Sequence, residues 1–160
     1  MATRAVEMQR LIRQYKFETK ATEVDMREVA KFAVSKGWPL PKPQDPIDAL
    51  AKRFSEAARE EIRHDKATKR PYRGNMAITM HSGDQQRTLW IDTDEAPRHR
   101  MVLALHRYRE QMIGEAVMGT NTAEHWNRMH PEQLALQFDS DLSDDVQWRL
   151  NGEEDLPQAS

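Results

Sequence analysis

Residues 76–91, MAITMHSGDQQRTLWI, decide the fold class of this 160-residue chain. Two short runs of β-type character flank a turn that contains Gly83, and this arrangement predicts a β-hairpin. Apolar residues at helical spacing dominate the sequence on both sides of the hairpin. We therefore expect an α+β fold that is mainly α, rather than an all-helical bundle.

Helical patterns precede the hairpin in three places. Apolar spacing predicts a first helix near residues 4–15. Asp25 can cap a second helix that Gly37 ends, and Asp45 can cap a third helix with Pro46 in its first turn. We expect the third helix to bury one stripe of apolar side chains: Ile47, Leu50, Ala51, Phe54, Ala58 and Ile62.

Two connecting segments in this first half read as irregular. Four prolines within residues 39–46 remove backbone donors and predict a stiff, extended connector. Residues 63–73 are basic and read as a loop that leads into the hairpin. We expect no regular element in either segment.

The chain after the hairpin combines helices with an acidic tail. A long helix is predicted to end near Gly119, and a capping box at Asn121 and Glu124 predicts a separate short helix after it. We expect one helical domain over residues 1–130 and a flexible, disordered acidic tail over residues 131–160. The long helix has one apolar row: Met101, Leu105, Tyr108, Met112 and Ala116.

The charges are unevenly distributed although the formal net charge is only −2. Residues 1–110 hold 22 Lys and Arg against 16 Asp and Glu, whereas residues 111–160 hold 2 against 10. A basic body attracts phosphates through counterion release. An acidic tail serves as a tether, as a protein-binding segment or as a solubilising extension, and composition leaves these roles open.

Composition also excludes several classes of protein. The chain has no cysteine, which excludes disulfide frameworks, thiolate metal sites and thiol catalysis. No apolar run approaches the length of a membrane span, and basic residues interrupt the first twenty residues where a secretion signal would be apolar. We expect a cytoplasmic protein with no membrane contact.

Residues 4–91 resemble a winged-helix domain in the order of their elements: three helices, a basic linker and one hairpin. The resemblance implies that the third helix contacts the DNA groove while the hairpin touches the backbone. The alternative is that Glu56, Glu60 and Glu61 pair with the cations on a solvated helix face. Eight candidate nucleic-acid-binding residues follow from this reading: Lys52, Arg59, Arg63, Lys66, Lys69, Arg70, Arg73 and Arg87.

The hexapeptide QLALQF at residues 133–138 is the sharper motif. It resembles the peptide with which bacterial proteins dock on the DNA polymerase sliding clamp. The resemblance implies that Gln133 enters a small polar pocket, that Leu134 contacts the clamp's apolar cleft, and that Leu136 and Phe138 anchor in this cleft. The same alternation of apolar residues also suits an extended segment packed on its own domain. The sequence leaves both readings open.

No complete catalytic signature is present, so we expect a protein that is not an enzyme and needs no cofactor or metal. The leading hypothesis is an accessory protein of bacterial DNA metabolism that binds the sliding clamp and also contacts DNA. A rival hypothesis is an adaptor subunit of a multiprotein complex that binds another protein along the helix at residues 97–118 and makes no contact with nucleic acid. A metal-dependent nuclease that uses Asp92, Asp94 and Glu95 ranks last, because the expected lysine is missing and Asp94 can cap a helix.

Overall fold

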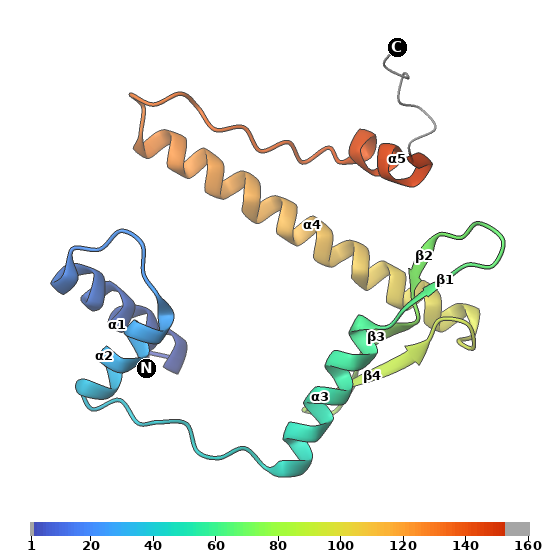
Figure 1. The fold of residues 1–160 in the computed structure, drawn as a ribbon, viewed down its shortest axis with the longest axis horizontal. Coiled ribbons are helices and arrows are strands. Elements are labelled where there is room, and N and C mark those ends of the chain that lie inside the picture. The colour runs from blue at the N-terminus through green and yellow to red at the C-terminus, as the bar shows by residue number, and fades with distance from the viewer. Residues whose placement is uncertain (1, 153–160) are drawn as a thin grey trace. The chain divides into compact units, whose positions relative to one another are not determined.

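The computed structural model describes residues 2–152, and in this part of the chain helices and two small antiparallel hairpins form an α+β, mainly helical fold, as predicted (Figure 1). The chain divides into two compact units, Met1–Leu50 and Ala51–Ser160, where the sequence predicts one domain through residue 130. The elements are, in chain order, α1 (Arg4–Thr19), α2 (Met26–Ser35), α3 (Pro46–Glu60), β1 (Ile62–His64), β2 (Pro71–Arg73), β3 (Asn75–Ser82), β4 (Gln85–Asp92), α4 (Arg98–Met129) and α5 (Ser143–Asn151).

In the first unit, α1 and α2 pack against each other through an aromatic contact. The rings of Tyr15 and Phe32 meet edge to face, with their centroids 5.4 Å apart. Asp25 caps α2 by accepting a hydrogen bond from the Arg27 amide at 2.8 Å. Gly37 adopts a positive φ of 91°, and the Trp38 amide donates to the Ala33 carbonyl at 2.9 Å, which is the expected helix end.

The third helix begins as predicted, but its apolar stripe is not buried. The carboxylate of Asp45 accepts from the amides of Ile47 and Asp48 at 2.8 and 3.3 Å, with Pro46 in the first turn. Ile47 and Phe54, however, are 73% and 68% exposed, and α3 has no buried residue. The expectation of a buried stripe is therefore wrong in this structure, because α3 makes few contacts with other elements.

The segment predicted as a basic loop contains a second hairpin, formed by β1 and β2. Its strands pair in register Ile62↔Arg73, Arg63↔Tyr72 and His64↔Pro71. Asp65 shapes the turn, because its carboxylate accepts from the amides of Ala67 and Thr68 at 2.8 and 2.9 Å. Lys69 then takes a left-handed conformation with φ of 63°. Short strands with few apolar residues carry almost no periodic signal, which explains why the hairpin was missed.

The predicted hairpin at residues 76–91 is confirmed as β3 and β4. The two strands pair antiparallel over eight residues each, and Ile78 lies opposite Leu89. Gly83 supplies the turn with a positive φ of 60°. One face of β3 packs on α4 through a small core of Met76, Ile78 and Ala104, of which Ile78 and Ala104 are each 1% exposed.

The long helix differs from the prediction at its carboxyl end. Helix α4 runs without a break for 32 residues, from Arg98 to Met129, and passes through Gly119, where we expected it to end. Asn121 and Glu124 therefore lie inside α4 and do not cap a separate helix. Gly119 interrupts the apolar pattern but costs only about 1 kcal/mol relative to alanine, so it does not stop a helix that has packing partners.

The segment after α4 is not wholly without structure, in contrast to the predicted disordered tail. Residues 131–142, which we call the strap, begin with a turn at 131–133 and then run back beside α4 without helix or strand (Figure 1). Helix α5 follows, with Asp144 and Asp145 in its first turn, where acidic side chains favour a helix. Residues 153–160 of the predicted tail lie outside the described residues.

Candidate functional site

The candidate peptide Gln133, Leu134, Leu136 and Phe138 lies within the strap. One side chain of α4 holds its backbone: the Asn127 amide group donates to the Leu136 carbonyl at 3.0 Å, while the Asn127 carbonyl oxygen accepts from the Leu136 amide at 2.7 Å. The side chain of Asn127 thereby replaces the neighbouring strand that an extended backbone would otherwise pair with. Sequence reasoning missed Asn127, because an asparagine inside a helix gives no signal of its distant partner.

Phe138 makes the second contact between the strap and α4. Its ring lies so close to Gly119 that a Cβ atom at that position would come within 2.4 Å of the ring carbon Cζ. Gly119 is therefore required for this contact rather than for the end of a helix. A flat ring can rest directly on the helix backbone only where a residue has no side chain.

The three apolar residues of the peptide differ in exposure. Leu134 is 93% exposed, whereas Leu136 and Phe138 are 51% and 47% exposed. The two residues that the resemblance assigns as anchors are thus half-covered, and the third is free. The structure places the peptide between the two sequence-based alternatives, since it is neither detached nor fully packed.

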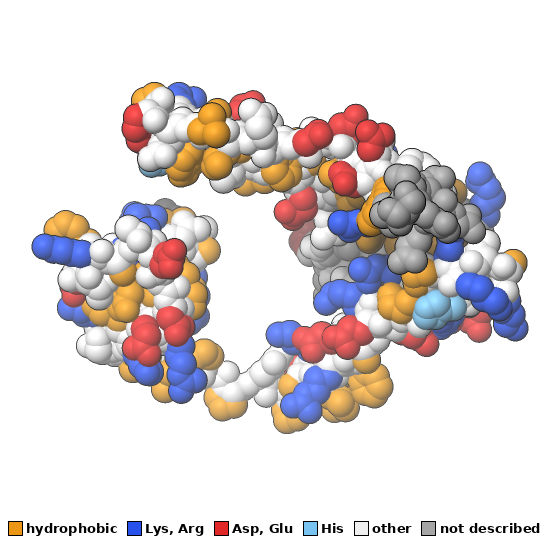
Figure 2. Space-filling model, turned by 45° about the horizontal axis from the view of Figure 1, so that its top comes forward, with side chains coloured by type: hydrophobic (Ala, Val, Ile, Leu, Met, Phe, Trp, Pro, Cys, Tyr) orange, Lys and Arg blue, Asp and Glu red, His pale blue; other side chains and the backbone are white. Residues whose placement is uncertain are grey.

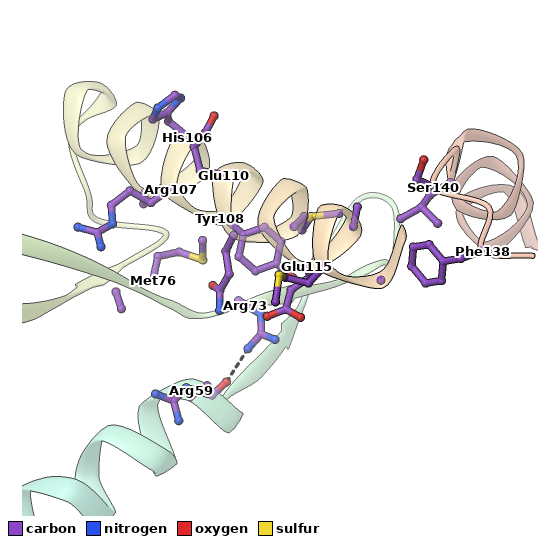
Figure 3. A pocket seen from close by; sticks show the side chains of 18 of the residues that line it. Arg59, Arg73, Met76, His106, Arg107, Tyr108, Glu110, Glu115, Phe138 and Ser140 are labelled. Carbon is purple, nitrogen blue, oxygen red and sulfur yellow. Dashed lines mark hydrogen bonds between the residues drawn. The ribbon is translucent and has the colours of Figure 1, made fainter. Parts of the chain in front are cut away.

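An open groove runs along α4 beside the strap, with a volume of about 1820 Å³. Figure 3 shows Phe138 and Ser140 at one end of it, Arg107 and Met76 at the other, and Tyr108 between them. Its lining is mainly apolar, and it includes Leu136 and Phe138. The groove therefore has the strap as one of its walls.

Arg63, one of the predicted nucleic-acid-binding residues, is engaged within the protein. Its guanidinium group forms a bidentate pair with Asp92, with both N–O distances at 2.9 Å. It also donates to Asp94 at 2.8 Å and to Glu61 at 3.0 Å. These contacts connect β1 to the end of β4, so Arg63 holds the two hairpins together.

The electrostatics of this carboxylate cluster follow from the guanidinium at its centre. Hydrogen bonds from Arg63, followed by the Asp94 backbone amide, lower the pKa of Asp92 to about 2. The same carboxylates, Asp92 first, raise the pKa of Arg63 above its usual value. Partial burial, together with the hydrogen bond to Asp94, raises the pKa of the Tyr72 hydroxyl.

The arrangement also bears on the nuclease hypothesis. Asp92 and Asp94 both face Arg63, which takes the position that a cation would need between them. Across residues 2–152, no group of three or more His, Asp or Glu side chains is placed to hold a metal ion. The carboxylates after β4 therefore act as partners of an arginine in this structure.

The other predicted basic residues fall into three places. Lys66, Lys69 and Arg70 are exposed in the β1–β2 turn, which we call the basic turn (residues 66–70). Arg59 and Arg73 lie at the groove, stacked over the rings of Trp90 and Tyr108 at 5.7 and 5.9 Å. The remaining two, Lys52 on α3 and Arg87 on β4, are exposed.

Arg59 and Arg73 are also joined directly, since Arg73 donates to the Arg59 carbonyl at 2.9 Å (Figure 3). Among the described residues, the recorded ion pairs include neither of them nor any residue of the basic turn. Of the expected pairs between these cations and Glu56, Glu60 or Glu61, the structure forms the one between Glu61 and Arg63, at 3.0 Å. Among the described residues, Glu56 and Glu60 form no ion pair. The basic turn thus holds three exposed cations within five residues, none of which forms an ion pair with another described residue.

No protein-family model matches this chain, and neither the curated proteins nor the solved structures contain a match. Among the described residues, no helix combines the length and the apolar character that crossing a bilayer requires.

Proposed function

We propose that this chain is a non-enzymatic accessory protein of bacterial DNA metabolism that docks on the DNA polymerase sliding clamp through Gln133, Leu134, Leu136 and Phe138. The proposal is carried by one observation: a complete hexapeptide of the docking type lies in a segment that belongs to no helix or strand. Such peptides bind as short extended or irregular segments whose apolar side chains fill a cleft on the partner.

The state of the peptide supports this role. Leu134 is almost fully exposed. Among the described residues, the backbone of the hexapeptide makes hydrogen bonds to Asn127, through Leu136, and to His130, through Gln133. Few bonds must therefore break before the segment reaches a partner. A peptide that orders on binding loses conformational entropy, so we expect weak to moderate affinity.

A binding measurement with purified bacterial clamp tests the proposal. The full chain should bind, and Leu136→Ala/Phe138→Ala should lower the affinity at least tenfold, which corresponds to about 1.4 kcal/mol. Leu142→Ala is the matched control, because Leu142 is equally apolar and 44% exposed but follows the hexapeptide. Equal binding by the double variant, or no binding by the unmodified chain, would contradict the proposal.

A DNA contact forms the second part of the proposal, as the winged-helix resemblance implies. We assign it to the basic turn, whose three exposed cations form no ion pair with the described residues, and we leave out Arg63 because carboxylates already engage it. Binding to duplex DNA should weaken steeply with salt. Lys66→Ala/Lys69→Ala should reduce the slope of log K against log salt by about 0.9 for each lost phosphate contact. An unchanged slope would remove the basic turn from the DNA interface.

The exposed apolar side chains of α4 favour a second candidate function, that of an adaptor subunit. Ala104 is the one fully buried residue recorded on this helix, whereas Val102, Leu105, Met112 and Val117 are 47–56% exposed. Figure 2 shows hydrophobic side chains at the surface in several places. Contiguous exposed apolar surface is typical of protein-binding faces. Partner binding that resists salt and is lost in Leu105→Glu/Val117→Glu, with clamp binding retained, would support the adaptor role.

A further inference from the structure

The helix that positions the docking peptide also covers its two anchors. We propose that α4 acts as an autoinhibitory latch: Asn127 and Gly119 hold Leu136 and Phe138, and the strap must leave α4 before the peptide can dock. This inference rests on the proposed clamp docking and concerns the regulation of that same site. It follows from geometry, since one side chain cannot fill a cleft on the clamp while it rests on α4.

The first part of the latch is the paired contact of Asn127. Its side chain makes two hydrogen bonds to Leu136, one with the backbone amide at 2.7 Å and one with the backbone carbonyl at 3.0 Å. Asn127 is partly buried by the strap, although it lies on a helix whose other asparagine, Asn121, is exposed and makes no recorded contact with the strap. Releasing Leu136 costs both bonds at once, which gives the latch two discrete states.

The second part is the contact of Phe138 with Gly119. The ring atoms Cζ, Cε1 and Cε2 would lie 2.4, 2.7 and 2.7 Å from a Cβ atom added at residue 119, so any side chain there must displace the ring. The other glycine of the helix, Gly114, has nothing within 4 Å of such an atom. Gly119 thus contacts the strap, whereas Gly114, on the same helix, does not.

Closing the strap lowers the affinity for any partner of the peptide. The apparent dissociation constant equals the intrinsic one divided by the fraction of molecules whose strap is open. Loss of two hydrogen bonds shifts this equilibrium by roughly tenfold toward the open state. Variants that weaken the latch should therefore bind the clamp more tightly, although none of them changes the docking peptide.

Two pairs of variants test the latch in the full-length chain. Asn127→Ala removes both hydrogen bonds to Leu136, and Asn121→Ala is its control. Gly119→Ala displaces Phe138, and Gly114→Ala is its control because both changes favour the helix to a similar extent. Within each pair the change in helix propensity is the same, so a difference between its members reports on the strap.

Each variant is measured in two ways. Hydrogen exchange of the Leu136 amide reports the strap directly, and we expect it to accelerate severalfold in Asn127→Ala and Gly119→Ala but not in the controls. Affinity for purified clamp should rise by about tenfold in the same two variants. Unchanged exchange, or accelerated exchange with unchanged affinity, overturns the latch while clamp docking stands. Absence of clamp binding in the unmodified chain overturns docking and its regulation together.

Discussion

Ile78 should be the most sensitive single position in the second unit. It is 1% exposed and connects β3 to Ala104 of α4, the helix that carries both strap contacts. Ile78→Ala removes three carbon atoms, which at about 0.8 kcal/mol for each buried carbon gives about 2.4 kcal/mol. The residual cavity raises the expected loss in the free energy of unfolding to about 3 kcal/mol, and Ile78→Val should cost about 1 kcal/mol.

Urea titration followed by circular dichroism measures these differences, and Leu89→Ala is the control. Leu89 lies opposite Ile78 in the hairpin but is 41% exposed, so its truncation should cost less than about 1 kcal/mol. At about 4 °C for each kcal/mol, Ile78→Ala should also lower the melting temperature by about 12 °C. Equal losses for Ile78→Ala and Leu89→Ala would refute the packing of β3 on α4.

Three further predictions concern the carboxylate cluster and a helix cap. The pKa of Asp92 in the folded protein is about 2, below its usual value of 3.8, so the ionised carboxylate stabilises the fold above about pH 4. This stabilisation is lost as the pH falls from about 4 toward 2. In Asp92→Asn, the free energy of unfolding should therefore decline less steeply between these two pH values. Gly74→Ala places a Cβ atom 2.6 Å from the Arg63 Nε atom, so thermal melting should reveal a clear loss of stability, whereas a melting temperature equal to that of the unmodified chain would contradict this contact. Asp45→Ala removes the cap of α3 and should cost about 1 kcal/mol, measured by denaturation; a cost near zero would mean that Pro46 suffices to start the helix.

The elements predicted correctly are those that local chemistry determines. Asp25 and Asp45 cap helices because a short carboxylate reaches the next amides, whatever the rest of the chain does. Gly37 and Gly83 take positive φ values that glycine adopts without strain. Each of these predictions depends on at most six consecutive residues.

The errors concern features that depend on distant residues. Arg63 ties the hairpin of β1 and β2 to β4, and its partners Asp92 and Asp94 lie about thirty residues further along the chain. The same distance hides the partners of Arg63 from the sequence, which shows a cation but not the carboxylates that engage it. Local sequence predicts a helix end near Gly119, since it cannot show that the neighbour of this glycine is Phe138, which is remote in sequence.

The docking peptide itself illustrates why its role could not be chosen from its residues. Leu136 and Phe138 alternate with polar residues, and this pattern suits a cleft on a partner and the surface of α4 for the same reason: an extended chain turns alternate side chains to one side. The contacts to α4 are few, since they comprise one asparagine and one ring on a glycine. A cleft that encloses both anchors would bury the roughly half of each side chain that α4 leaves exposed. Under the proposed latch, competition between these two surfaces, rather than the motif alone, determines whether the peptide rests on its own helix or on a partner.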